Sequence, residues 1–263
     1  MPRGASRIFA QYDTLYGISS FVASVMAEAT GRDVQVVHHG IWPSLCPFRP
    51  APSSGPVTFV HLGQVDPRKA TDLLFRAFVT AFPRGNEDVR LLVKCGKNHS
   101  ELAHEWWRSH GKSDSRIQIH AAHIPRAELS EYFHQAHAVV MPSRCEGFGM
   151  VGLEALAHGR MPILTGWSGP ADYVSPNDCA ILPATQKVPA YIYPGHAREP
   201  DFDALVEELR AVAQNLDAAT AKGLRGRARV IEDWTWPHRV GTGYLGLTGG
   251  SKALPNTARA ENA

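Results

Sequence analysis

Short apolar runs alternate with amphipathic segments through the middle of this chain. The runs that we predict as strands are residues 57–63, 89–96, 116–120, 138–143 and 161–166. The segment after the first run has helical spacing, since Leu74, Phe78 and Phe82 recur every four residues. Because consecutive parallel strands need a crossover connection, this alternation predicts an α/β fold with a doubly wound, Rossmann-like parallel sheet and helices on both faces. Folds of this class bind ligands at the carboxyl ends of their strands.

The composition narrows the range of partners. The 27 Lys and Arg against 25 Asp and Glu leave a formal charge of +2, which gives no support to a nucleic-acid partner. No apolar stretch approaches the length of about 18 residues that a membrane span needs, and the first residues lack the apolar core of a secretory signal. We therefore expect a cytoplasmic protein without a transmembrane segment. The cysteines are scattered singly, as free thiols in a reducing compartment are, at Cys46, Cys95, Cys145 and Cys179.

Two common cofactor classes find little support in the sequence. No G-x-G-x-x-G motif follows the first strand, which argues against a nicotinamide dinucleotide. His120 and His123, like His134 and His137, have a spacing that suits a metal, but no carboxylate or cysteine nearby in the sequence completes a ligand set. We expect no metal site and no resident cofactor.

One segment combines two acids with a glycine-rich turn. Glu146 and Glu154 are spaced as E-x7-E, and Gly147 and Gly149 between them allow a tight turn before a helix. The amides of Phe148, Gly149, Met150 and Val151 would then point at an anion near the helix N-terminus. Glu154 lies about one turn into that helix, so the two carboxylates are predicted to flank one ligand. The alternative interpretation is a pair of solvated surface acids.

This segment, with its PS-x-x-EGFG start and its WSGP loop, resembles the signature of the family 4 retaining glycosyltransferases, which have the two-Rossmann GT-B architecture. The resemblance implies that Glu146 contacts hydroxyl groups of the donor sugar and that Glu154 binds the nucleotide ribose. It also implies that the amides of the intervening residues meet the sugar and the phosphates. It extends over roughly residues 5–246.

The loop HLGQVDPRKA resembles the glycine loop of the same family, in which an Arg directly after the Gly and a Lys five residues later bind the diphosphate. Gly63 and Lys69 match the pattern, whereas Gln64 stands at the position of the arginine. Glutamine brings hydrogen bonds and no charge, and Arg68 is the cation that would have to compensate. Lys69 as an ordinary surface lysine is the alternative. Gly96 lies where a base-binding loop follows in the family.

The resemblance also predicts a domain organisation. Residues 1–45 resemble only the last part of the acceptor-side Rossmann domain, and residues 46–56 are a Pro/Ser/Gly-rich linker. Residues 57–228 are predicted to form the donor-binding domain, 229–248 a C-terminal crossover helix, and 249–263 a disordered tail. The rest of an acceptor domain would need about 100 further residues. We therefore expect that the chain is a fragment, the product of an alternative start, or a lone donor domain whose acceptor half a partner chain supplies.

The sequence therefore predicts a retaining glycosyltransferase that moves a hexose from a nucleotide diphosphate sugar to an unknown acceptor, with Glu146 and Lys69 as its catalytic residues. No metal is demanded, because Lys69 and the helix amides would stabilise the leaving diphosphate. The alternative hypothesis is a non-catalytic nucleotide-sugar-binding or scaffold subunit, which the glutamine at position 64 favours.

Overall fold

The computed structural model describes residues 5–190 and 195–241 and is built around one six-stranded sheet. All neighbouring strands of this sheet run parallel, in the order β5-β4-β3-β6-β7-β8. The strands are β3 (Val57–Leu62), β4 (Val89–Cys95), β5 (Ile117–Ala121), β6 (Ala138–Met141), β7 (Met161–Thr165) and β8 (Ala180–Leu182). The predicted α/β fold with a doubly wound parallel sheet is confirmed, and β8 is a strand that the sequence analysis missed.

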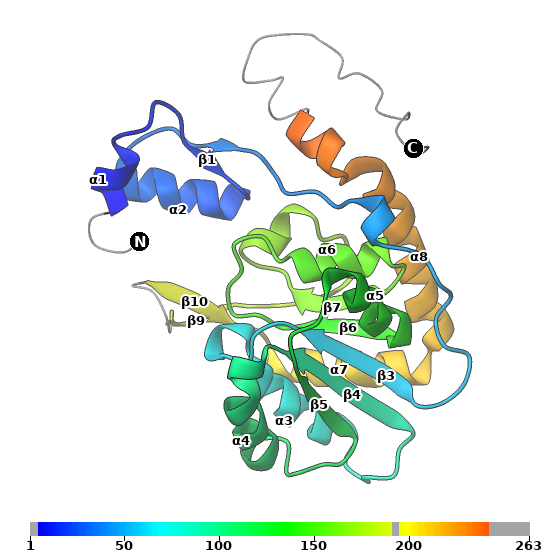
Figure 1. Ribbon diagram of the computed structural model, residues 1–263. Helices are drawn as coiled ribbons and strands as arrows, with labels where there is room; N and C mark the ends of the chain where they lie inside the picture. The colour runs from blue at the N-terminus through cyan, green and yellow to red at the C-terminus, as the bar shows by residue number, and fades with distance from the viewer. Residues whose placement is uncertain (1–4, 191–194, 242–263) are drawn as a thin grey trace.

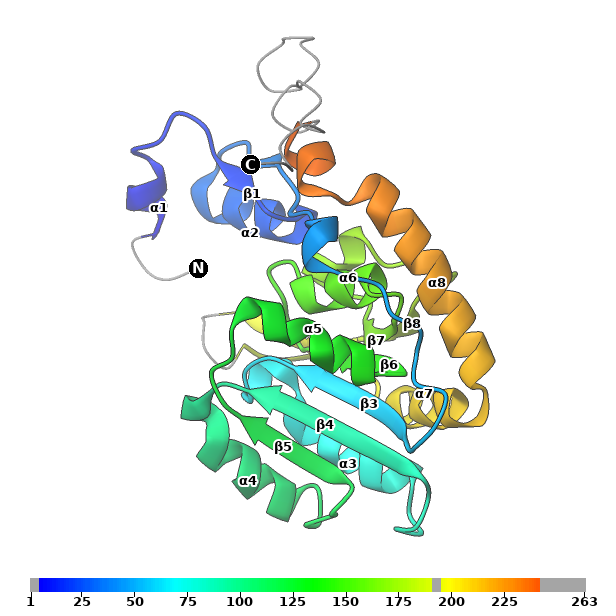
Figure 2. The same cartoon turned by 45° about the vertical axis from the view of Figure 1, so that its right-hand side comes forward.

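Helices cover both faces of the sheet (Figures 1 and 2). One face is covered by α3 (Thr71–Ala81), α4 (Ser100–Ser109) and α7 (Phe202–Gln214). The other face is covered by α5 (Arg126–Gln135), α6 (Met150–Ala157) and α8 (Leu216–Asp233). The central strand β3 is buried from its second residue onward, which accounts for the apolar residues that make up most of its sequence.

The apolar positions predicted on the first helix form part of the larger core. Phe59 from β3 lies 6.4 Å from Phe78 and 5.9 Å from Phe82 between ring centroids. The rings of Phe78 and Phe82 are 5.2 Å apart and meet edge to face. Such aromatic pairs add to the free energy gained by burial, and here they fix α3 against the sheet.

The first part of the chain packs over the edge of the sheet at which its strands end (Figure 1). It consists of α1 (Ala5–Phe9), α2 (Ser20–Thr30) and a two-stranded parallel sheet of β1 (Tyr16–Gly17) and β2 (Gln35–Val36). The chain then passes the C-terminal helix, where Ile41 forms a parallel bridge with Thr235, and turns through the 3₁₀ helix η1 (Pro43–Leu45).

Three more short 3₁₀ helices and a β-hairpin complete the fold. The 3₁₀ helices are η2 (Pro67–Lys69), η3 (Lys97–His99) and η4 (Gly169–Asp172). The hairpin pairs β9 (Gln186–Pro189) with β10 (His196–Glu199).

The C-terminal segments were predicted from composition and from the family resemblance. Residues 202–233 form two helices, α7 and α8, and a further helical segment spans 236–241. The tail predicted at 249–263 and the last part, 242–248, of the crossover helix predicted at 229–248 lie outside the described residues, and the domain boundaries stay a prediction. Among the helices that the structure describes, none is both long and apolar enough to cross a membrane.

Candidate active site

The sheet order creates a crevice between β3 and β6. From β3 the chain continues to β4 on one side, whereas β6 continues to β7 on the other, so the loops that leave these two strands diverge. Ligands of open α/β sheets bind at such a topological switch point, beyond the carboxyl ends of the strands. The loop after β3 carries Gly63 to Lys69, and the loop after β6 carries Glu146 to Gly149. The two motifs found in the sequence therefore meet at one place.

Glu146 is the centre of a buried polar cluster at this switch point. Its Oε1 lies 2.5 Å from Nζ of Lys69 and accepts a hydrogen bond of 2.7 Å from the Ser143 hydroxyl. Its Oε2 lies 2.9 Å from the guanidinium of Arg68. The backbone N–H of Glu146 donates to the Ser168 hydroxyl at 2.9 Å. The side chain is thus held by two cations and a hydroxyl group.

Burial by itself raises the pKa of Glu146, because a carboxylate loses hydration in the interior. The charges of Lys69 and Arg68 and the hydrogen bonds from Lys69 and Ser143 outweigh that effect and lower the pKa below its ordinary value. Glu146 is therefore ionised at neutral pH, and its one negative charge is shared between the two cations that face it.

Local structure aims Lys69 at this cluster. Asp66 caps η2 by accepting a hydrogen bond of 2.9 Å from the backbone N–H of Lys69. Gly63 has a φ of 143° and carries no side chain, so the stem of Lys69 passes close beside it. A Cβ at Gly63 would lie 3.4 Å from Cε of Lys69. Lys69 itself is 9% exposed, so it is not the ordinary surface lysine of the alternative interpretation.

The N-terminus of α6 is held in a fixed orientation. Its N-cap, Gly149, has a φ of 85°, which a residue with a side chain adopts only with strain. The Tyr173 hydroxyl donates to the Gly149 carbonyl at 2.6 Å. The first-turn amides of Met150 and Val151 have no partner within the helix and are suited to an anion.

Glu154 lies one turn into α6, as predicted, and is 4% exposed. Burial raises its pKa, although an ion pair with Arg126 opposes the shift. Arg126 begins α5, and its side chain is 52% exposed, so the partner of the buried acid comes from the surface of the cleft. The interpretation of Glu146 and Glu154 as solvated acids is wrong, since both are buried.

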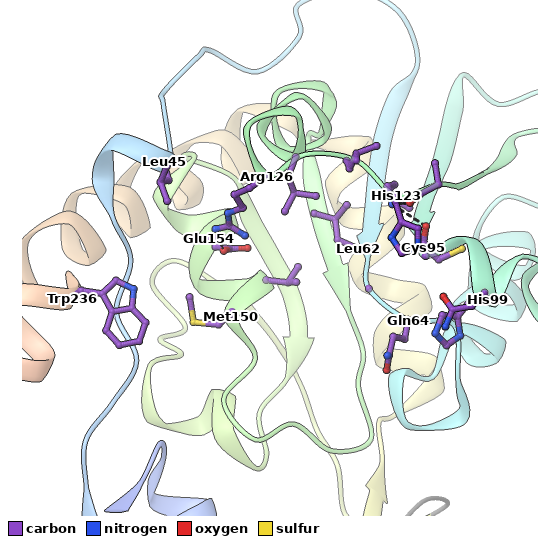
Figure 3. Close-up of a pocket in the computed structure, with 18 residues that line it drawn as sticks. Leu45, Leu62, Gln64, Cys95, His99, His123, Arg126, Met150, Glu154 and Trp236 are labelled. Carbon is purple, nitrogen blue, oxygen red and sulfur yellow. Dashed lines mark hydrogen bonds and ion pairs between the residues drawn. The ribbon is translucent and has the colours of Figure 1, made fainter.

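A cleft with a volume of about 910 Å³ extends along this edge of the sheet (Figure 3). It is lined by Leu45, Leu62, Gly63, Gln64, Lys94, Cys95, Gly96, Asn98, His99, Ala122, His123, Ile124, Arg126, Leu129, Met150, Val151, Glu154 and Trp236. Six of the predicted site residues are among them: Gly63, Gln64, Gly96, Met150, Val151 and Glu154. Lys69 and Glu146 are not among the lining residues and pair with each other beside Gly63.

Phe148 contributes to packing with its ring. The ring is 3% exposed and lies 5.3 Å from His39, 5.5 Å from Tyr173 and 6.1 Å from Trp234 between centroids. Only its backbone amide remains for a ligand, as the sequence analysis supposed. The histidines before the linker therefore pack on the loop that carries Glu146.

The sequence analysis missed the contacts that tie the N-terminal part of the chain to this loop. The Ser19 hydroxyl donates to the Gly147 carbonyl at 2.6 Å. The Asp172 carboxylate accepts a 2.7 Å hydrogen bond from the backbone N–H of Ser20 and lies 2.9 Å from Nε2 of His38. These pairs are more than 100 residues apart in the sequence, and no local pattern signals them.

Histidines of the described residues serve as packing and hydrogen-bonding groups. His134 Nε2 bonds the Pro47 carbonyl and His137 Nε2 the Pro52 carbonyl, both in the linker. Within the described part of the chain, no group of three or more His, Cys, Asp or Glu side chains is arranged to hold a metal ion.

Solved structures with this fold include several glycosyltransferases. The chain aligns with sucrose-phosphate synthase from Thermosynechococcus elongatus at a TM-score of 0.69 and 21% identity, over 93% of this chain and 61% of the other. It aligns with Anabaena HepE in complex with UDP and glucose at a TM-score of 0.73 and 14% identity, over 94% of this chain and 66% of the other.

Two curated relatives are similar to this chain in sequence. A D-inositol 3-phosphate glycosyltransferase of Kribbella flavida is 30% identical over 157 residues, which are 57% of this chain and 34% of the relative. A glycogen synthase of Mycobacterium tuberculosis is 23% identical over 85% of this chain and 51% of the relative. The chain thus spans about a third to a half of the length of these two relatives.

A family model covers a larger part of the chain than either motif. The model described as family 4 glycosyltransferase in conflict systems matches residues 18–242, which include the N-terminal contacts, the cleft and both helices after the sheet. Because this match extends over most of the sequence, the chain belongs to the family 4 glycosyltransferases in conflict systems.

Proposed function

We propose that this chain binds a nucleoside diphosphate sugar in the cleft and takes part in the transfer of its hexosyl group with retention of configuration. The observation that carries the proposal is that the cleft brings Gly63, beside which Lys69 lies, together with the first turn of α6 and Glu154. A cation and free helix amides suit a diphosphate, and a buried carboxylate suits the hydroxyl groups of a ribose. Anabaena HepE, which shares the fold, has been solved with UDP-glucose.

The diphosphate would compete with Glu146 for the two cations. In the structure Lys69 and Arg68 both pair with Glu146, and Gln64 in the cleft adds no charge. When the diphosphate binds, we expect Lys69 and Arg68 to turn toward its oxygens. The Glu146 carboxylate is then released and accepts hydrogen bonds from the hydroxyl groups of the donor sugar.

The ribose is assigned to Glu154 by the same reasoning. Its carboxylate is buried, lines the cleft and is paired with the half-exposed Arg126. Arg126 has room to move aside, and ribose hydroxyl groups would take its place as hydrogen-bond donors to Glu154. Charge-assisted hydrogen bonds of this kind are among the stronger polar contacts in proteins.

The chemistry requires the bond between the sugar C1 and the diphosphate oxygen to break, with its electron pair leaving on the diphosphate. An acceptor oxygen then bonds to C1 on the same face, and its proton passes to a diphosphate oxygen. Lys69 and the amides of Met150 and Val151 stabilise the charge that develops on the leaving group. In our proposal they do so without a divalent metal, and residues of an acceptor-binding half, on this or a partner chain, exclude water.

A second candidate function is nucleotide-sugar binding without transfer, as a scaffold subunit. It is favoured by Gln64, because a cleft with a neutral side chain at this point offers the diphosphate less positive charge. The two functions differ in turnover. An enzyme releases nucleoside diphosphate from the donor sugar, by transfer or by slow hydrolysis, whereas a binding subunit does not.

The decisive experiment measures release of nucleoside diphosphate from UDP-, GDP- and ADP-hexoses by the full chain, alongside Lys69→Met. Lys97→Met is the matched control, because Lys97 is an exposed lysine of η3 that does not line the cleft. Release by the wild type and by Lys97→Met that is lost in Lys69→Met supports transfer. Saturable binding without release from any donor supports the scaffold function instead.

A further inference from the structure

The side of the cleft formed by the ends of β4 and β5 contains a buried lysine without a carboxylate partner. Lys94 is 7% exposed, and its Nζ donates to the main-chain oxygens of Cys95 at 2.8 Å and Ala122 at 2.6 Å. An ammonium group has three N–H donors, so one is left over. Among the described residues no carboxylate lies within ion-pair distance of Lys94, although burying an unpaired charge is costly.

His99 adds an unused acceptor to the same side of the cleft. Its Nδ1 lies 3.1 Å from the Val65 carbonyl, which can only accept, so Nδ1 carries the proton. In the neutral ring Nε2 is then an acceptor. This Nε2 is buried and has no hydrogen-bond partner, although His99 lines the cleft. Buried polar atoms are seldom left unsatisfied, and a ligand is one explanation of such an atom.

The two side chains lie apart from the groups assigned to the ribose. In Figure 3, Cys95, His99 and His123 are on one side of the cleft, whereas Glu154 and Trp236 are on the other. Gly96 lies between Lys94 and His99 in the sequence and contributes no side chain to the cleft. The charged groups of the opposite side, Glu154 and Arg126, pair with each other and are assigned to the ribose. The polar edge of a nucleobase therefore finds a donor and an acceptor on the side of β4 and β5.

We propose that Lys94 and His99 select nucleobases in which a carbonyl oxygen adjoins a ring N–H. Lys94 donates its remaining N–H to the carbonyl, and Nε2 of His99 accepts the adjacent N–H. Uracil, thymine and guanine have this pattern. In cytosine and adenine an amino group replaces the carbonyl and the adjacent ring nitrogen has no proton, so both contacts are mismatched. The inference rests on the proposed function, because it places the base of the donor nucleotide.

Sites that hydrogen-bond a ligand reject the mismatched analogue more strongly than apolar pockets reject a change in size. UDP and CDP are a matched pair of the same size that differ in this pattern, and GDP and ADP are the corresponding purine pair. Calorimetric titration of the full chain with all four is expected to show binding at least about tenfold tighter for UDP than for CDP, or for GDP than for ADP.

The variants assign this discrimination to the two side chains. Lys94→Met is expected to reduce it to within about threefold, whereas Lys97→Met, which removes an exposed lysine from the same segment, retains it. Lys94 is buried, so thermal unfolding checks that its variant folds. His99→Ala, in the short helix η3, is the second variant and is also expected to lose discrimination.

Each outcome has a distinct meaning. Equal affinity for both members of each pair overturns the inference and leaves the proposed function standing. Discrimination that survives in both folded variants also overturns it. Failure of the folded wild type to bind any of the four nucleotides contradicts the proposed function, and the inference falls with it.

Discussion

The ammonium group of Lys69 lies 2.5 Å from the Glu146 carboxylate, although the two residues are 77 positions apart in the chain. Lys69 ends the loop after β3, and Glu146 belongs to the loop after β6, so their contact closes the crevice at the switch point. The pair keeps the cation that we propose for the diphosphate buried beside a carboxylate. In the proposed function, donor binding is an exchange of partners, in which phosphate oxygens replace that carboxylate.

The ion pairs of Glu146 with Lys69 and Arg68 make it important for stability as well as for its proposed function. Glu146→Gln leaves Lys69 without its carboxylate partner and Arg68 with only the 3.8 Å contact to Asp66, so we expect the free energy of unfolding to fall by about 3 kcal/mol at pH 7. Urea unfolding measures this change. The control is Glu131→Gln, which removes an exposed ion pair with Arg49 and should change stability by less than about 1 kcal/mol.

The direction of the pKa shift gives this stabilisation a pH dependence. The pKa of Glu146 is lowered in the folded chain, so its contribution is present above the ordinary value of 4.5 and is lost as the pH falls below it. The difference in stability between the wild type and Glu146→Gln should therefore shrink under acidic conditions. A difference that stays constant from pH 7 to pH 3 would contradict the assigned ion pair.

The ionised Glu154 carboxylate is expected to have the opposite effect on stability. Burial raises its pKa, so the folded state favours the protonated acid, and the ionised carboxylate at neutral pH reduces stability. We expect Glu154→Gln to unfold at the same urea concentration as the wild type or a higher one at pH 7. Nucleotide affinity should nevertheless fall about tenfold, because a charged acceptor for the ribose is lost. Lower stability together with unchanged affinity would show that Glu154 is a structural acid.

The burial of His61 predicts a second effect of pH on the free energy of unfolding, in the range in which histidine titrates. It lies fully buried in β3, with Nδ1 2.8 Å from the Val140 carbonyl and Nε2 3.2 Å from the Thr71 hydroxyl. Burial lowers its pKa from 6.5 to about 4, with a further lowering by Lys69, while Glu146 and Asp66 oppose the shift. The unfolded chain therefore binds the proton first as the pH falls.

The resulting loss of stability is confined to a pH window. The contribution of His61 is complete above pH 6.5 and declines as the pH falls toward about 4, by roughly 2 to 3 kcal/mol. His61→Gln should flatten the decline of the free energy of unfolding between these two values. An unchanged slope in a folded variant would be evidence that His61 is charged in the native state.

Two glycines of the site differ in the room around them. A Cβ at Gly169 would lie 2.4 Å from the Gly147 carbonyl oxygen and from Cα of Phe148, which are backbone atoms that cannot turn aside. A Cβ at Gly147 would lie 3.5 Å from Cδ1 of Ile18, an ordinary contact. We expect Gly169→Ala to lower the melting temperature by several degrees and Gly147→Ala to change it little. Equal effects would contradict the packing of these two loops.

Metal removal tests the proposed electrostatics of the leaving group. Because Lys69 and the amides of α6 are assigned to the diphosphate, we expect EDTA treatment to leave nucleotide affinity and turnover unchanged within about twofold. The measurement compares calorimetric titration and nucleotide release before and after EDTA. Loss of both, with recovery on addition of Mg²⁺ or Mn²⁺, would show that a metal shares the phosphate charge.

Much of the fold could be predicted from local patterns in the sequence. Buried parallel strands leave short runs in which most residues are apolar, and amphipathic helices leave a four-residue repeat such as Leu74, Phe78 and Phe82. β8 was missed because its three residues are too few to show a period. The pair β9 and β10 was missed because its residues are largely exposed and lack an apolar pattern.

The candidate site could also be predicted only in part from the sequence. The spacing of Glu146 and Glu154 around a glycine turn is a local pattern, and it predicted which residue lies in the loop and which on the helix. The partners of these acids come from distant parts of the chain. The contacts between Arg126 and Glu154 and between Ser19 and Gly147 form because the sheet brings distant loops together. No local pattern in a single sequence predicts such contacts.

The most direct test of the central claim is calorimetric titration of the full chain with nucleoside diphosphates, in parallel with Lys69→Met and Glu154→Gln. Our account predicts saturable binding of at least one nucleotide, weakened at least about tenfold in each folded variant. Undiminished affinity in both folded variants, or no binding by the folded wild type, would contradict the assignment of this cleft to the donor nucleotide.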